Sequence, residues 1–92
     1  MGTQRMLRIQ RSEKREVVFT LSGQMDDEPI AQLETLINSE TKGRRVILDL
    51  KDVTLVNENA IAFLMRCEAN SITLTNCPGY VREWINAERR EN

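Results

Sequence analysis

Apolar and polar residues alternate at the start of the chain, and this pattern predicts a β-hairpin. The first strand is expected over residues 6–11 and the second over residues 17–21, because a half-buried strand points its side chains alternately to the core and to water. The polar stretch at residues 12–15 is short enough to connect two antiparallel neighbours. Ser22 and Gly23 are expected to end the second strand, and the first strand is expected at an edge of the sheet.

The first helix is expected to begin at residues 26–29. Asp26, Asp27 and Glu28 suit the positive end of a helix dipole, and the proline that follows them suits a first turn. The next apolar residues recur at helical spacing and predict one buried stripe: Ile30, Leu33, Leu36 and Ile37. The helix is expected to end before Gly43, which can adopt the left-handed conformation common after a helix.

A central strand and a second helix are predicted in the middle of the chain. Residues 46–48 form a continuous apolar run flanked by charged residues, which is typical of a central strand covered on both faces. Asn57 and Asn59 are both possible N-caps of a helix that runs to about Glu68. In this helix three residues are expected to face inward, Ile61, Leu64 and Met65, while Phe63 and Arg66 are expected to point elsewhere.

The last elements complete an alternating order. Residues 71–75 alternate again and predict a strand, and Pro78 is expected to open a final helix with Val81, Trp84 and Ile85 on its buried side, together with Tyr80 as a further candidate. The predicted order is β-β-α-β-α-β-α. We therefore expect a single α/β domain over residues 1–92, with a mixed sheet covered by helices on at least one face.

Composition narrows the classes of function. Thirteen basic and 14 acidic residues give a net charge of −1, which argues against nucleic-acid binding through a broad basic field. The chain has no histidine, so hydrolase triads and the commonest metal ligand are absent. Cys67 and Cys77 form no Cys-x-x-Cys pair and are expected to be reduced core residues of a cytoplasmic protein. No apolar run approaches the roughly 20 residues of a membrane span, so no membrane insertion is expected.

Two acidic positions are candidates for chemistry. Asp26, Asp27 and Glu28 could hold a divalent metal, although acidic residues at a helix start more often complement the dipole. Asp49 closes a central strand, where α/β proteins often place functional groups, but a carboxylate at this position more often binds backbone N–H groups of the following loop. The sequence therefore predicts no catalytic residue, no metal site and no cofactor.

Residues 49–65 read D-L-K-D-V-T-L-V-N-E-N-A-I-A-F-L-M. This stretch resembles the signature of STAS domains, which occur in anti-sigma-factor antagonists and in the cytoplasmic tails of sulfate transporters. That family reads roughly D-L-S-G-V-x-[FY]-[IM]-D-S-S-G-L-[GA]-x-L. Residues 18–26 resemble the second strand of the family and its Gly-x-[LM]-Asp turn, and residues 72–76, with Val81 and Ile85, resemble its last strand and helix. The resemblance spans nearly the whole chain and implies a STAS-like fold.

The chain departs from the family at the centre of the signature. In the family's D-S-S-G, the second serine is phosphorylated by a partner kinase, and these four positions are occupied here by Asn57, Glu58, Asn59 and Ala60. Asn59 stands at the phosphoacceptor position and has no hydroxyl. The resemblance implies a partner-binding surface with seven residues: Met25, Asp26, Asn57, Glu58, Asn59, Ala60 and Phe63. The alternative interpretation is that residues 57–59 only cap a helix.

The resemblance implies a non-catalytic protein-interaction module that acts in bacterial regulation as anti-sigma-factor antagonists do. The expected partner is an anti-sigma factor, a serine-kinase-like protein or a transporter component, and the oligomeric state stays open. Alternative functions are a nucleotide- or lipid-sensing domain and an accessory subunit of a transporter complex. Because a helix N-terminus favours negative charge, we also expect the substitution Asn59→Asp to be tolerated in the free domain with a gain of roughly 0.3–1 kcal/mol. It is expected to weaken partner binding, because the new carboxylate must be desolvated when the partner covers the site.

Overall fold

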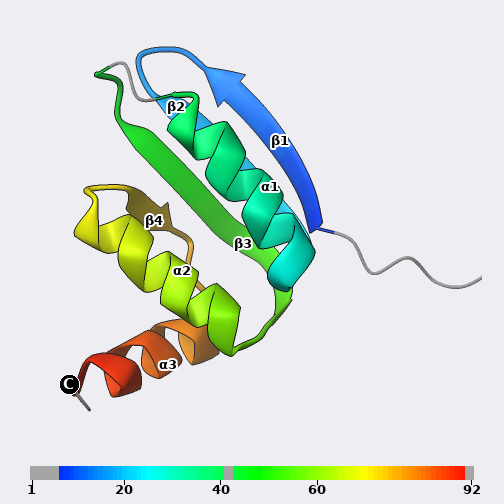
Figure 1. Cartoon of the computed structure of the whole chain (residues 1–92), viewed down its shortest axis with the longest axis vertical. Coiled ribbons are helices and arrows are strands. Elements are labelled where there is room, and N and C mark those ends of the chain that lie inside the picture. The colour runs from blue at the N-terminus through cyan, green and yellow to red at the C-terminus, as the bar shows by residue number, and fades with distance from the viewer. Residues whose placement is uncertain (1–6, 41–42, 91–92) are drawn as a thin grey trace, which may run out of the picture.

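The computed structural model describes residues 7–40 and 43–90, and their order of elements is the predicted β-β-α-β-α-β-α (Figure 1). The elements are β1 (Leu7–Glu13), β2 (Val17–Met25), α1 (Asp27–Asn38), β3 (Val46–Val56), α2 (Glu58–Ala69), β4 (Thr73–Thr75) and α3 (Gly79–Arg90). The strands form one mixed sheet in the order β1-β2-β3-β4. The fold class predicted from the sequence is therefore confirmed.

The sheet combines an antiparallel hairpin with two parallel pairings. β1 pairs with β2 antiparallel, as the alternating pattern predicts, and β1 lies at an edge; residue 6, where the first strand was expected to begin, lies outside the described residues. β3 lies between β2 and β4 and is parallel to both. The prediction that residues 46–48 belong to a central strand is confirmed.

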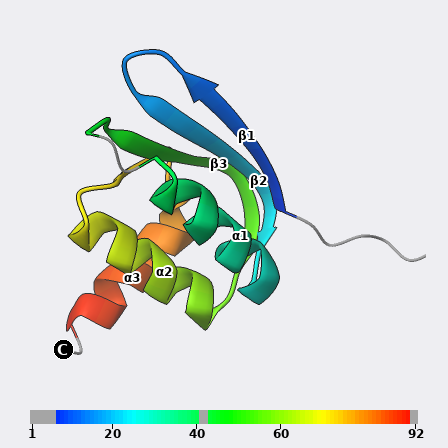
Figure 2. The ribbon, with the colours of Figure 1, turned by 45° about the horizontal axis from the view of Figure 1, so that its top comes forward.

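Helices cover one face of the sheet, and this differs from the expectation for β3. The connections from β2 to β3 and from β3 to β4 each lead to the next strand on the same side along the sheet. Two right-handed crossovers that progress in the same direction place their helices, α1 and α2, on the same face. Figures 1 and 2 show α1 and α2 side by side over that face. Val46 and Leu48 are buried beneath the helices, whereas Ile47 between them is partly exposed on the opposite face. The expectation that residues 46–48 are covered on both faces of the sheet is therefore wrong.

The core lies between this face and the helices. Its largest fully buried side chains come from the two central strands and all three helices, among them Phe19, Leu48, Leu33, Leu64 and Ile85. The buried stripe of α2 is wider than predicted, because this helix contacts α1, α3 and the sheet. Phe63 is only 2% exposed, so the expectation that it points away from the core was wrong. Met65, expected to face inward, is only partly buried.

Two strands run further than the sequence pattern predicts. β2 continues through Gly23 to Met25 because Gly23 adopts a φ of +106°, and the register with β3 shifts between Gly23 and Gln24. A positive φ of this kind is open to glycine with little penalty. β3 in turn extends to Val56, so that both strands reach the same end of the sheet. β4 is shorter than expected and begins at Thr73.

α3 packs against α2 through apolar residues and an ion-pair cluster. Val81 and Ile85 are fully buried and Trp84 is partly buried against the core, as predicted. Tyr80 is instead 49% exposed, and its hydroxyl donates a hydrogen bond to the Thr54 carbonyl oxygen at 2.9 Å. This bond attaches the start of α3 to the last part of β3, where β4 no longer pairs.

Candidate functional site

The carboxyl ends of β2 and β3 bring two helix starts together. The two strands are parallel, and Met25 at the end of β2 lies opposite Val56 at the end of β3. Each strand is followed directly by a helix, so the N-termini of α1 and α2 lie at this same end of the sheet. The acidic run before α1 and the asparagines before α2 are distant in sequence but adjacent in space.

A carboxylate joins the two helix starts. One oxygen of Asp27, Oδ1, accepts hydrogen bonds from Asn59 Nδ2 at 2.8 Å and from Asn57 Nδ2 at 3.3 Å. Asn57 Oδ1 accepts the backbone N–H of Ala60 at 2.8 Å, so Asn57 is the N-cap of α2. We call these three residues, Asp27, Asn57 and Asn59, the Asp27 clasp. Of the two N-caps considered from the sequence, the structure selects Asn57, and it assigns Asn59 to the contact between helices.

The clasp changes the expectation for an acidic residue at position 59. An aspartate there would replace the amide that donates to Asp27 and would place two carboxylates close together. Repulsion between like charges at this distance opposes the gain from the helix dipole, which is roughly 0.3–1 kcal/mol. Asn59→Asp is therefore expected to destabilise the free domain, which differs from the tolerance expected from the sequence.

The residues named from the family resemblance divide into an exposed group and a buried group. Glu58 and Asn59 are exposed, and Asp26 and Asn57 are partly exposed. Met25, Ala60 and Phe63 are 1%, 0% and 2% exposed and belong to the core. Met25, Ala60 and Phe63 pack in the core, so a partner that binds at this surface would contact the exposed group instead.

Two further residues belong to this end of the molecule and were not singled out as contact residues from the sequence. Asp27 was considered only as a helix-dipole charge or a metal ligand, because its contact with Asn59 depends on the register of β2 and β3. Leu55 is 56% exposed near the end of β3. Alternation along β3 does not indicate this exposure, because Val53, two residues earlier, is buried.

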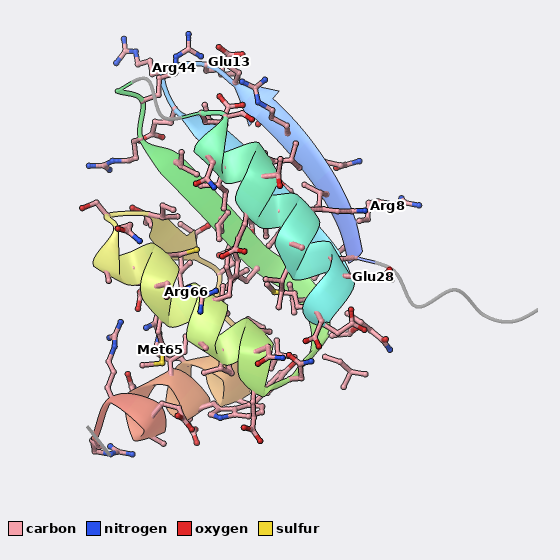
Figure 3. The ribbon with its side chains drawn as sticks, viewed as in Figure 1. Arg8, Glu13, Glu28, Arg44, Met65 and Arg66 are labelled. Atoms are coloured by element: carbon pink, nitrogen blue, oxygen red, sulfur yellow. The ribbon has the colours of Figure 1, made fainter. Side chains whose placement is uncertain are left out.

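This end of the molecule is acidic. Asp26, Asp27, Glu28 and Glu58 take part in none of the ion pairs among the described residues. At the opposite end, near the turn between β1 and β2, Glu13 pairs with Arg44 (Figure 3). An open hollow of about 410 Å³ beside the start of α1 is lined by these residues: Leu7, Asp26, Asp27, Glu28, Pro29, Gln32 and Asn57. Within residues 7–40 and 43–90, no group of three acidic or cysteine side chains could hold a metal ion.

The remaining candidates for chemistry have structural roles. Asp49 Oδ1 accepts the backbone N–H of Lys51 at 3.0 Å and the side-chain amide of Asn76 at 3.1 Å, which fits the loop-holding interpretation. Both cysteines are free. Burial raises the pKa of the Cys67 thiol to about 12 and also raises the pKa of Cys77. Cys67 is therefore protonated and unreactive near neutral pH.

No protein-family model and no curated protein matches this chain. In the part of the chain that the structure describes, no helix has the length and apolar character needed to cross a membrane. The geometry at the starts of α1 and α2 and the sequence of residues 57–60 are the features of this chain that bear on its function.

Proposed function

We propose that this chain is a non-catalytic protein-interaction module of the STAS type, acting in the cytoplasm in bacterial regulation as anti-sigma-factor antagonists do. It works without a phosphorylatable serine, cofactor or metal. Its partner is an anti-sigma factor, a serine-kinase-like protein or a transporter component, rather than a nucleic acid.

The observation that carries the proposal is the Asp27 clasp. It fixes the starts of α1 and α2 against each other and leaves Glu58 and Asn59 exposed, with Asp26 and Asn57 partly exposed. A surface that is ordered before binding loses less conformational entropy when a partner docks. In the family that the sequence resembles, the positions of Asn57, Glu58 and Asn59 are those through which binding is controlled.

The chemistry of Asn59 supports constitutive binding. Its amide is neutral and has no hydroxyl to accept a phosphoryl group, so a partner kinase has no acceptor at this position. A phosphoserine there would carry about −1.5 to −2 charges. The domain is therefore proposed to bind its partner without being switched off by phosphorylation at residue 59.

Nucleotide sensing is less well supported at this surface. The hollow beside α1 is lined by the carboxylates of Asp26, Asp27 and Glu28, which would repel phosphate groups. A role as accessory subunit of a transporter complex uses the same protein-binding surface and differs only in the partner.

The experiment that tests the proposal is partner capture from an extract of the source organism followed by titration of the purified partner. The variant Glu58→Arg reverses a charge at the proposed surface, and Arg15→Glu reverses one in the turn between β1 and β2, at the opposite end of β2. We expect a single regulatory or transporter protein to bind the parent and Arg15→Glu, and we expect at least a tenfold loss for Glu58→Arg, equal to about 1.4 kcal/mol.

Two results would contradict the proposal. Equal binding by Glu58→Arg and the parent would show that the helix starts are not the interface. Transfer of phosphate from ATP to the domain by the captured partner would show that regulation uses a different acceptor.

A further inference from the structure

The Asp27 clasp places a negative charge against residue 59. Asn59 Nδ2 lies 2.8 Å from Asp27 Oδ1, and the same oxygen accepts from Asn57 at 3.3 Å. The oxygen accepts from two side-chain amides, which are donors that add no charge.

Among residues 7–40 and 43–90, no arginine or lysine forms an ion pair with Asp27, and Arg8 on β1, at the same end of the molecule (Figure 3), pairs with none of the acidic residues around it. Asp26 and Glu28 on its own segment and Glu58 on α2 are all acidic, and the neighbours from β1 and from the start of α2 are Leu7 and Asn57. None of these four carboxylates takes part in an ion pair among residues 7–40 and 43–90. A second anion at position 59 would stand at the place of the Asn59 amide, which lies 2.8 Å from Asp27 Oδ1, and would be repelled by that carboxylate.

We propose that Asp27 requires a neutral hydrogen-bond donor at position 59, so that the charge of this surface is permanent. An anion introduced at residue 59 would be repelled by Asp27 and would open the clasp. This inference concerns regulation of the proposed interaction surface and takes its biological meaning from the proposed function. Its consequence is that replacing Asn59 by serine would not be enough to create a phosphate switch, because Asp27 would oppose the phosphate.

Melting of the isolated domain at two pH values tests the inference. Asn59→Asp is expected to melt roughly 2–6 °C below the parent at pH 7, since the two carboxylates are exposed and their repulsion is partly screened. In this variant the folded pair binds a proton more tightly than the unfolded chain does, so stability relative to the parent falls as pH rises from about 4 to 7. The deficit should therefore be small at pH 4 and largest at pH 7.

Exchanging the two residues is the matched control. The double variant Asp27→Asn with Asn59→Asp restores one carboxylate and one amide at the contact, so it should recover most of the melting temperature lost by Asn59→Asp at pH 7. Asn59→Ser adds no charge, and any loss it shows should be the same at both pH values.

The inference is overturned if Asn59→Asp melts at or above the parent at pH 7, if its deficit is equal at pH 4 and pH 7, or if the double variant melts no higher than Asn59→Asp. These measurements need no partner. A failure here leaves the binding experiment unaffected, and a failure to find a partner leaves the melting prediction intact.

Discussion

Two asparagines at the start of α2, the N-cap Asn57 and Asn59 in the first turn, have different roles although they are only two residues apart. Asn57 accepts the Ala60 N–H and fixes where the helix begins, whereas Asn59 donates its amide across to α1. Both are consistent with a cap when only the sequence is considered. Both side-chain amides donate to Asp27 Oδ1, Asn59 at 2.8 Å and Asn57 at 3.3 Å, and the roles differ because the oxygen of Asn57 also accepts the Ala60 N–H of its own helix.

The cap leads to a stability prediction at Asn57. Asn57→Ala removes the acceptor for the Ala60 N–H and should lower the free energy of unfolding by about 1 kcal/mol. Asn57→Ser keeps an oxygen at the cap and should lose less than half of that amount. Urea unfolding curves of the three proteins measure the difference, and an alanine variant as stable as the parent would show that the cap contributes nothing.

At the scale of elements, α3 is attached to α2 by a carboxylate shared between two arginines. Glu68 near the end of α2 accepts two hydrogen bonds from Arg82 of α3, at 3.2 and 3.3 Å. It also forms an ion pair with Arg89, in the last turn of α3. Burial acts to raise the pKa of Glu68, but the hydrogen bonds and charges of Arg82 and Arg89 outweigh it, so the pKa lies below its ordinary value.

Acid should therefore loosen the attachment of α3. A carboxyl whose folded pKa is depressed stabilises the protein above its unfolded pKa of about 4.3, and this contribution is lost as pH falls through the folded pKa. Glu68→Gln should be less stable than the parent by about 1 kcal/mol at pH 7, and the difference should shrink below pH 4.

The matched control is Glu83→Gln on α3, since Glu83 is exposed and takes part in none of the ion pairs of the described residues. Unfolding free energies across pH 2–7 measure both variants. A gap between Glu68→Gln and the parent that stays constant down to pH 2 would show that the ionised carboxylate is not what holds α3.

At the scale of the whole molecule, the sequence predicts the order and type of the elements because the apolar periods are clear. The alternation in residues 7–11 and the unbroken run at 46–48 identify an edge and a central strand correctly. What it does not predict depends on contacts between elements. The burial of Phe63 follows from α2 having neighbours on several sides, and the pairing of Asp27 with Asn59 follows from the register of β2 and β3.

The agreement between strand order in the sheet and strand order along the chain has a kinetic consequence. Every strand pairs with the next one in sequence, and the parallel pairs Val17–Val46 and Ile47–Thr73 each close a loop of about 30 residues or fewer. The entropy cost of closing a loop grows with the length of the loop. Small mixed α/β domains fold more slowly than helical bundles and faster than all-β sandwiches. We expect stopped-flow refolding in one main exponential phase on the order of milliseconds. A main phase lasting seconds, beyond the minor slow phase that isomerisation at Pro29 and Pro78 in the unfolded chain produces, would mean that the sheet does not assemble from neighbouring strands.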